Sequence, residues 1–528
     1  MTAVASTDSR GTERPRRTLF GWLPERASNT DLAWGLTLLV IVAAYALLYV
    51  NQLGAGLEFD EAYNLEVSRN LALGHGYATE GTMFGVDKKL FDPYITTGPT
   101  MLLPAGLLWW ISGGALWAVR LVPLALFTGF LIVLYRIGAQ VLGRWGGLVL
   151  AACPLLLHVG SRDLVTDSLV PGRMIGEFVG VGLLYICFWW LMRDRPLLAG
   201  LAAGLAVQTK SNLVLAGGIL LLTWFVTTWI QRRRFPVRGL WAAAGAVLPT
   251  IAFEIYRLIS FGGSITLWQA SVTELQQFVD AQTTNVVDPW ARLTPFAQLV
   301  SVGGYVLAAV AVLAAVHAVW RRARRHAAGS STASTGRTDR QREHLMTALM
   351  LALAVGAVVL LATWIFQSKQ DSVRQGLPTV LILVPLLGLA VLRELRHVRP
   401  LRVHGHSVRL LVPALAMAIG AFGAVQTVLV FLDPSAREMR TQQQAGVLAL
   451  QRSGTPSLPI NDWFHNPEML ILTGIPAQSR PGVGAPTVKV YTSLNALVVE
   501  GFPDARFMVH RCYGQILYAE RDLLICRV

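Results

Sequence analysis

Two adjacent carboxylates, Asp60 and Glu61, are the residues of this chain best placed by type and spacing to do chemistry. They stand in "GLEFDEAYNLEVSRNLALGHGYATEG" (56–81), directly after the first long apolar segment. A carboxylate within hydrogen-bond reach of a hydroxyl can take its proton during attack, which accelerates a reaction typically ~10²–10⁴-fold. Neighbours in the chain need not point the same way, so we expect these two to have separate roles.

Further charged residues recur in the polar segments between later apolar blocks. They are Lys88 and Lys89, Arg173 and Glu177 in "HVGSRDLVTDSLVPGRMIGE" (158–177), Lys210 at the end of an apolar segment, and Arg374 in "QSKQDSVRQ" (367–375). Ionisable groups at membrane depth are costly and commonly mark a functional site. The alternative stays open, because membrane-protein loops are polar in any case and carboxylates at a helix start also interact with its dipole.

The elements that must position these residues are membrane helices. Of the 528 residues, 53% are hydrophobic and 14% are charged, against about 25% charged in soluble domains. A span needs about 20 residues of apolar helix. We expect eleven spans, at 31–50, 115–136, 145–160, 174–192, 197–210, 213–230, 239–258, 296–319, 346–366, 376–393 and 409–431. The segment 100–113 is too short and interrupted to span, and with Trp109 and Trp110 it suits an interfacial helix.

The basic residues predict the orientation of these spans. If residues 1–30 form a disordered cytoplasmic N-terminus, 25 of the 45 Lys and Arg residues fall in cytoplasmic loops, including 232–234 and 321–325. This asymmetry is what the positive-inside rule predicts. It accounts for the net charge of +14 without a nucleic-acid partner. No small-residue cleavage site follows the first span, so we expect it to be retained.

The C-terminal region differs in composition from the rest. After an odd number of spans, residues 433–528 lie on the extracytoplasmic side, where their Pro and Gly turns and short apolar runs predict a small α/β domain. Cys512 and Cys526 lie in this region and could form a disulfide there. Cys153 and Cys187 fall inside spans and are expected to be inert core thiols.

Several motifs resemble one family. "FDEAYNLEVSRNLALGHGY" (59–77) and "TTGPTMLLPAGLLWWISGG" (96–114) are similar to the first external loop of the GT-C membrane glycosyltransferases. The most similar branch is that of protein O-mannosyltransferases and aminoarabinose transferases. "GEFVGVGLLYICFWW" (176–190), "LAGLAAGLAVQTKSNLVL" (198–215) and "QSKQDSVRQGLP" (367–378) fit later parts of the pattern, so that the resemblance covers roughly residues 31–395.

The resemblance implies an α-helical polytopic GT-C fold and an inverting glycosyltransferase that uses a polyprenyl-phosphate-linked sugar donor. It implies that Asp60 is the catalytic base, while Glu61 positions the acceptor or a nearby cation. The phosphate of the donor would be bound by Lys88 or Lys89 and by Arg374. Arg374 offers a fork of donors, whereas lysines act as point charges. By their place in the pattern, Lys210 is assigned to the phosphate and Glu177 to the substrate. Tyr63 and Arg173 are further residues expected to bind the substrate.

The remaining expectations concern partners and rival functions. No cofactor and no metal is expected, since His75, His158 and His465 have no ligand spacing. The acceptor is a glycan, a lipid or a protein, and membrane lipid surrounds a multi-pass plasma-membrane protein. Neither the sugar nor the acceptor can be derived from the sequence. A lipid or solute transporter and a non-catalytic protein of cell-envelope assembly remain as alternatives.

Overall fold

The computed structural model describes most of the chain. The described residues are 29–79, 89–90, 97–159, 169–260, 262–281, 288–327, 337–366, 373–397, 402–403, 406–407, 411–433, 435–455, 458–459, 467–475, 477–478, 488–492, 505–512, 515–521 and 523–527. Residues 1–28 of the expected N-terminal segment and Lys88 lie outside these ranges.

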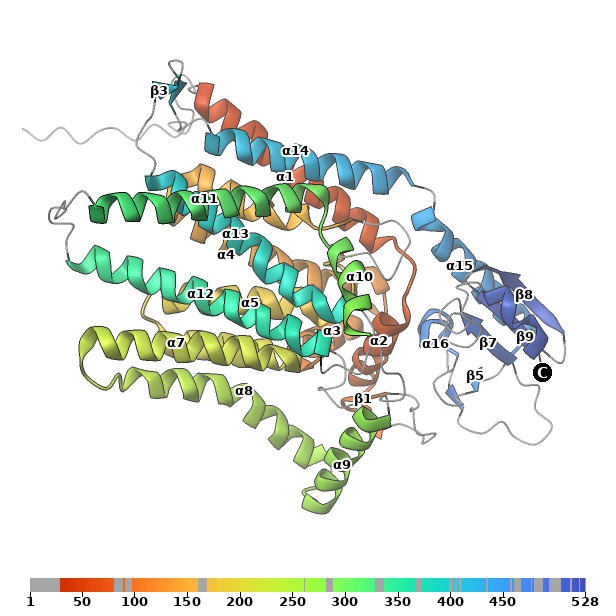
Figure 1. Ribbon diagram of the computed structural model, residues 1–528. Helices are drawn as coiled ribbons and strands as arrows, with labels where there is room; N and C mark the ends of the chain where they lie inside the picture. Colours follow the sequence, from red (N-terminus) through yellow and green to blue (C-terminus); the bar gives the residue numbers. More distant parts are fainter. Residues whose placement is uncertain are drawn as a thin grey trace, which may run out of the picture.

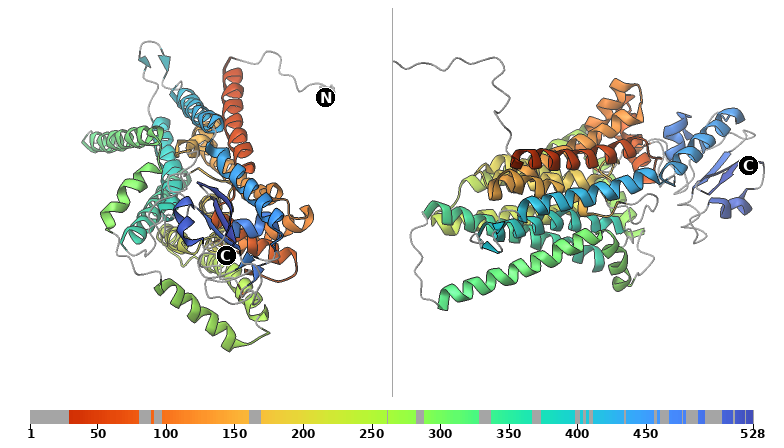
Figure 2. Two further views of the ribbon diagram at one scale, coloured as in Figure 1. Left: turned by 90° about the vertical axis from the view of Figure 1, so that its right-hand side faces the viewer. Right: turned by 90° about the horizontal axis from the view of Figure 1, so that it is seen from above.

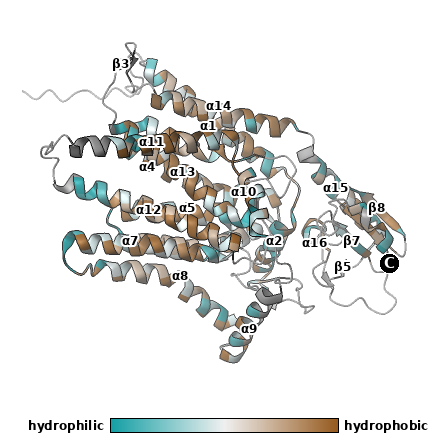
Figure 3. Ribbon diagram, in the orientation of Figure 1, coloured by the Kyte–Doolittle hydropathy of each residue, from teal (hydrophilic) through white to brown (hydrophobic). Residues whose placement is uncertain are grey.

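Apolar helices lie side by side and form a bundle (Figure 1). They are α1 Asn29–Leu53, α4 Leu116–Ala152, α5 Gly176–Leu191, α6 Pro196–Val207, α7 Val214–Arg232, α8 Arg238–Ser260, α11 Val302–Ala327, α12 Arg337–Phe366, α13 Leu377–His397 and α14 Leu411–Leu432. Eight helical segments of the described chain are long and apolar enough to cross a membrane. Hydrophobic residues dominate them (Figure 3). The expected polytopic membrane architecture is confirmed.

Two expected spans are shorter in the structure. Helix α5 has 16 residues and α6 has 12. At 1.5 Å per residue, α6 is about 18 Å long, well under a hydrocarbon core of about 30 Å. It stops at Val207, and the carbonyl of Gln208 packs directly against Gly98, where a side chain would not fit. The chain of the expected span 197–210 therefore leaves the helix before Lys210.

Helix α4 covers the expected span 115–136 from its second residue onward and the first half of the expected span 145–160. Leu142 and Gly143 have non-helical backbone angles, and Gly143 has φ 65°. A Cβ on Gly138 would overlap the carbonyl of Gly146. In a straight helix those residues would be about 12 Å apart along the axis. The chain therefore reverses at Gly143, and its second arm continues into the 3-10 helix η1, Cys153–Leu156.

Short elements gather where the apolar segments end. Helices α2 Phe59–Ala72 and α3 Pro99–Ser112 lie at one end of the bundle, here called the α2 end (Figure 1). The other short elements are β1 Ala78–Thr79, β2 Lys89–Leu90, η2 Ser211–Leu213, α9 Ile265–Ala281, η3 Pro289–Arg292, α10 Leu293–Gln298, η4 Val373–Gly376, β3 Arg402–Val403 and β4 His406–Ser407. Helix α3 matches the expected interfacial helix, and its Leu103, Leu107, Trp110 and Ile111 are exposed.

The C-terminal region forms a small domain beyond the α2 end. Figures 1 and 2 both place it past the helix ends on that side. Its elements are α15 Ser435–Ser453, β5 Leu458–Pro459, α16 Pro467–Thr473, β6 Ala477–Gln478, β7 Val488–Thr492, η7 Ala505–Arg511, β8 Ile516–Glu520 and β9 Leu523–Arg527. Strand β9 pairs antiparallel with β7 and β8, and β5 pairs parallel with β6.

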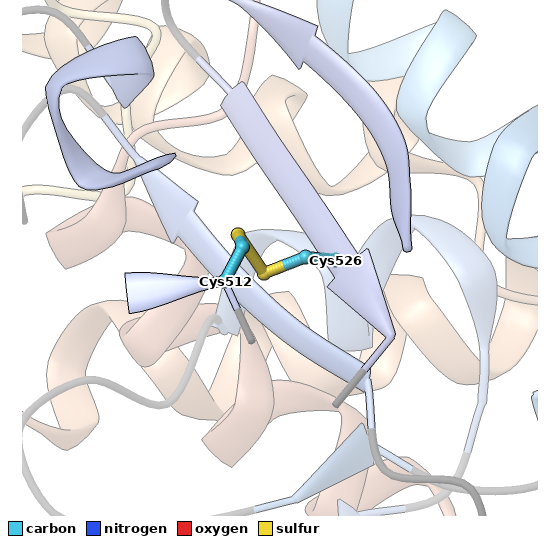
Figure 4. Close-up of a disulfide and its surroundings, with 2 residues drawn as sticks. All are labelled: Cys512 and Cys526. Atoms are coloured by element: carbon cyan, nitrogen blue, oxygen red, sulfur yellow. A yellow bond between two sulfur atoms is a disulfide. The ribbon is translucent and has the colours of Figure 1, made fainter. Parts of the chain in front are cut away.

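Both faces of β9 are buried. Leu523 and Ile525 pack toward Gly446 of α15, whereas Leu524 and Cys526 face the side of η7. This alternation follows from the two-residue period of a strand. Cys526 forms a disulfide with Cys512, with a Cα–Cα distance of 5.8 Å (Figure 4). The small C-terminal α/β unit agrees with the expectation.

The reversal in α4 predicts a sharp difference between two glycines of that helix. Gly138→Ala should destabilise the protein by about 1–3 kcal/mol, because the added methyl group meets backbone across the turn. Gly129→Ala is the matched control, since nothing lies within 4 Å of a Cβ there. Thermal unfolding in detergent measures both. Equal Tm values for the two variants would contradict the hairpin.

Candidate active site

A buried arginine organises the chain around the acidic pair. Arg120, near the start of α4, is 1% exposed, and Glu61 is 0% exposed. Its Nε donates to Glu61 Oε1 and its Nη2 donates to Oε2, each at 2.7 Å. This is the bidentate fork that is strongest between guanidinium and carboxylate. The structure therefore gives Glu61 a cation to hold and encloses both of its oxygens, which fits one of its two expected roles and leaves the acceptor role without support.

The remaining donors of Arg120 bind main-chain carbonyls where α1 ends. Nη1 donates to Gln52 at 3.0 Å and to Ala55 at 2.8 Å, and Nη2 donates to Gly56 at 3.0 Å. These carbonyls belong to the last turn of α1 and to the α1–α2 linker, residues 54–58. Two of the five N–H groups of Arg120 thus bind Glu61, and the other three fix the backbone that leads into α2.

Asp60 pairs with a different arginine. Its carboxylate accepts from Nη2 of Arg374 in η4, and its side chain is 37% exposed. Arg374 Nε lies 3.6 Å from Glu177 Oε1 in the first turn of α5. Lys210 Nζ lies 3.1 Å from the same oxygen. These four residues form the charge cluster, which the fold assembles from four separate segments at the α2 end.

The charge cluster holds Asp60 ionised. Burial acts to raise the pKa of Asp60, but the charge and hydrogen bond of Arg374 and the charge of Lys210 outweigh it, so the pKa is lowered overall. Asp60 also stands in the first turn of α2, where the helix dipole favours an anion. Its carboxylate is therefore a proton acceptor at neutral pH, positioned beside two cations.

A second ion pair borders the cluster. Arg173 contacts Glu58, the residue directly before α2, and both are largely buried. Burial lowers the pKa of Arg173, and the nearby charge of Arg374 lowers it further. Gln52 holds the segment that carries Arg173, because it donates to the Leu169 carbonyl at 3.0 Å and accepts from the Gly172 N–H at 2.5 Å. The segment before α2 and the segment before α5 are thereby joined beside Asp60.

Tyr63 lies within the packing of α2. Its ring stacks on Phe59 with centroids 6.3 Å apart, and its side chain is 7% exposed. Burial raises the pKa of Tyr63, as do the charges of Glu66 and Asp60, while a hydrogen bond with Thr79 opposes them. Lys89 is described by its backbone, in register with Thr79 across β1 and β2. Asn70 of α2 donates to the Ala78 carbonyl of β1 at 2.8 Å, so β1 lies against α2 and β2 pairs with β1. Lys88 falls outside the described residues.

Arg120, Glu58 and Gln52 were not among the residues predicted from the sequence. Arg120 carried a usable signal, because it is a charged residue inside the apolar run "WAVRLVPLALF" (117–127). The expectation grouped Asp60 with Arg374, Glu177 and Lys210, and the structure brings these together. Within the described ranges, no group of three or more His, Cys, Asp or Glu residues could hold a metal ion.

Two solved structures show the same architecture. ArnT from Cupriavidus metallidurans bound to undecaprenyl phosphate aligns with a TM-score of 0.56 at 12% sequence identity, over 93% of this chain and 98% of that chain. The apo state of that protein aligns with a TM-score of 0.58 at 12% identity, over 94% and 98%. No protein-family model matches this chain, and no curated protein sequence matches it significantly. The chain therefore shares the ArnT-like membrane fold, and the resemblance read from its motifs is confirmed at the level of fold.

The burial of Arg120 predicts that its replacement destabilises the protein much more than neutralisation of Glu61 does. Arg120→Met should lower the free energy of unfolding by about 3–5 kcal/mol, because it leaves the Glu61 carboxylate buried without a partner. Glu61→Gln retains an oxygen acceptor and should cost less. The double variant Arg120→Met with Glu61→Leu should recover part of the loss. Thermal or denaturant unfolding measures all three, and a double variant no more stable than Arg120→Met would contradict the interpretation.

The lowered pKa of Asp60 predicts how stability depends on pH. A carboxyl whose folded-state pKa is below its unfolded value, about 3.9, stabilises the fold above that value and loses the contribution as pH falls through the lowered pKa. The Tm of the wild type relative to Asp60→Asn should therefore stay constant between about pH 7 and 5 and fall at more acid pH. A Tm difference that does not change with pH would show that Arg374 does not favour the ionised form.

Proposed function

We propose that this protein is a glycosyltransferase that moves a sugar from a polyprenyl-phosphate-linked donor to an acceptor hydroxyl at the extracytoplasmic membrane face. The observation that carries the proposal is the charge cluster, in which an ionised carboxylate lies beside an arginine and a lysine at one end of an apolar bundle. A lipid-linked phosphosugar needs such a place, because its chain stays in the membrane while its head reaches polar groups.

Asp60 supplies the base in this proposal. An acceptor hydroxyl is a weak nucleophile at neutral pH, and a carboxylate in hydrogen-bond reach removes its proton as it attacks the anomeric carbon. The bond between that carbon and the phosphate oxygen breaks as the new glycosidic bond forms. One base on the face opposite the leaving group suffices for single displacement, which inverts the anomeric configuration.

Arg374 and Lys210 supply the cations that receive the leaving group. The phosphate of the donor carries one negative charge as a diester, and as the released monoester it approaches two, with a second pKa near 6. Cations already in place stabilise the charge that develops during bond breaking. Glu177 holds both of them through one carboxylate oxygen. Lys88 and Lys89 stay proposed as further phosphate-binding residues, and Tyr63 and Arg173 as residues that line the substrate site.

Binding of the donor would change the partner of Arg374. In the present arrangement its guanidinium is shared between Asp60 and Glu177. A phosphate competes for the same fork of donors. When it takes Arg374, the carboxylate of Asp60 loses a positive neighbour, its pKa rises, and it becomes a stronger base beside the acceptor. The free protein would thus keep its base paired until the donor arrives.

Two features support the extracytoplasmic orientation. The turn between α7 and α8, with Arg232–Arg234, lies at the end of the bundle opposite α2 (Figure 1). Arginine-rich turns favour the cytoplasmic side. The disulfide of the C-terminal domain lies beyond the α2 end, and disulfides persist in oxidising compartments.

An ArnT structure of the same fold contains undecaprenyl phosphate, which supports a polyprenyl phosphate as the lipid of the donor.

Replacement of the base tests the proposal most directly. Asp60→Asn should lower turnover by ~10²–10⁴-fold, the usual share of general base catalysis, while donor binding persists. Reconstituted protein would be incubated with a panel of undecaprenyl-phosphate-linked pentoses and hexoses and candidate acceptors, with sugar transfer followed by mass spectrometry. Asp31→Asn is the matched control, because Asp31 is an exposed carboxylate in the first turn of α1 that pairs with Arg144.

Two outcomes of this experiment would contradict the proposal. Unchanged turnover in Asp60→Asn would place the base elsewhere. Neither binding nor turnover of any donor by the wild type would favour a transporter or an envelope-assembly protein over an enzyme.

A further inference from the structure

The C-terminal domain holds the backbone that leads to Asp60. Gln443 of α15 donates from Nε2 to the Leu57 carbonyl at 2.6 Å, and its Oε1 accepts from the Leu57 N–H at 2.8 Å. Gln443 is 8% exposed and Leu57 is 1% exposed. One side-chain amide thus satisfies both main-chain groups of a buried residue that stands three positions before Asp60. Loss of a partner leaves such groups unpaired away from water, at substantial cost.

Neighbouring contacts bind the same linker to α15. Arg440 donates from Nη1 to the Gly54 carbonyl at 2.8 Å. A Cβ on Gly56 would lie 2.8 Å from Met439 Cγ, so the linker and α15 approach as closely as glycine allows. Arg120 binds the carbonyls of Ala55 and Gly56 from the side of the bundle. The α1–α2 linker is therefore held between the bundle and the C-terminal domain.

A second contact lies further along α2. Ile471 and Leu472 of α16 pack against the apolar cluster that contains Tyr63 and Leu65 of α2 and Met101 of α3. The helix that carries Asp60 is thus braced by the C-terminal domain before its first turn and on its packed face. The remaining members of the charge cluster, Arg374, Glu177 and Lys210, belong to segments of the bundle.

We propose that Gln443 is a positioning residue, through which the C-terminal domain sets the place of Asp60 relative to the cations of the bundle. The proposal rests on the proposed function. Because the C-terminal domain holds the helix of Asp60 and the bundle holds the cations, loss of the Gln443 contact should affect catalysis and donor binding differently. When the contact is lost, the cations remain where they are and continue to bind donor phosphate, while the base on α2 moves away from the reacting hydroxyl. The rate of transfer falls and the affinity for the donor persists.

Two adjacent glutamines provide the test. Gln443→Leu removes both hydrogen bonds to Leu57, and Gln444→Leu makes the same change at the exposed neighbour on α15. With the undecaprenyl-phosphate sugar that the wild type turns over best, Gln443→Leu should lower kcat by about 10- to 100-fold, as expected for a misplaced catalytic group. Its KM for the donor should stay within about threefold, given that the phosphate contacts persist. Gln444→Leu should match the wild type in both constants.

A conservative variant guards against a folding defect. Gln443→Glu keeps the acceptor for the Leu57 N–H but sets a carboxylate oxygen against the Leu57 carbonyl in place of the donor, so its kcat should also fall below that of Gln444→Leu. Equal kcat in the three proteins would overturn the proposal. A loss confined to KM would overturn it as well, because that would place Gln443 in donor binding.

Amide hydrogen exchange gives a readout that does not depend on activity. In the full-length protein, the peptide that contains residues 52–58 should exchange faster in Gln443→Leu than in Gln444→Leu. If the wild type turns over no donor, the proposed function fails, and this comparison still tests the contact. Unchanged exchange would overturn the positioning role, whereas faster exchange confined to Gln443→Leu would retain the link between the C-terminal domain and the α1–α2 linker.

Discussion

The buried pair of Arg120 and Glu61 is the interaction on which the organisation of the site depends. Removing two charges from water is expensive, and their attraction offsets that cost when the geometry is bidentate and the remaining donors are satisfied. Both conditions hold, since Arg120 also binds the carbonyls that end α1 and begin the α1–α2 linker. With Glu61 drawn inward, the residue before it on the helix is turned to the partly exposed side. The enclosed member of the acidic pair, Glu61, thereby orients Asp60, the residue that we propose as the base.

The second organising constraint is charge balance at a membrane end. Asp60 and Glu177 alternate with Arg374 and Lys210, so a cluster with no net charge can remain partly buried without a ligand. In the proposed function, a donor phosphate adds negative charge that the two cations accept, and Asp60 is released from Arg374. On that proposal, the same four groups are stable in the free protein and form a preorganised site for the donor.

Much of the fold could be predicted from local sequence, because apolar runs of span length have few alternatives to membrane helix. The turn at Gly143 divides two expected spans, and α2 begins beside the acidic pair as its charged first turn suggested. The partner of Glu61 and the contact from Gln443 could not be predicted. Both join positions that are distant in the chain, and neither has a periodic pattern. Helix α6 was expected to reach Lys210, but close packing at Gly98 is a tertiary constraint with no local signal.

The distances along the chain that separate these partners have a consequence for biosynthesis. Asp60 and Arg374 are 314 residues apart, and Leu57 and Gln443 are 386 apart. Contacts of such separation form late, after the loops between them have closed. A nascent chain that has inserted its first helices therefore carries the carboxylate but neither the cation beside it nor the glutamine that braces its backbone. About a sixth of the chain follows Gln443, so this contact is added only near the end of translation. A protein that ends before α15 would contain every helix of the bundle and all four residues of the charge cluster, yet it would lack the glutamine that holds the backbone before Asp60.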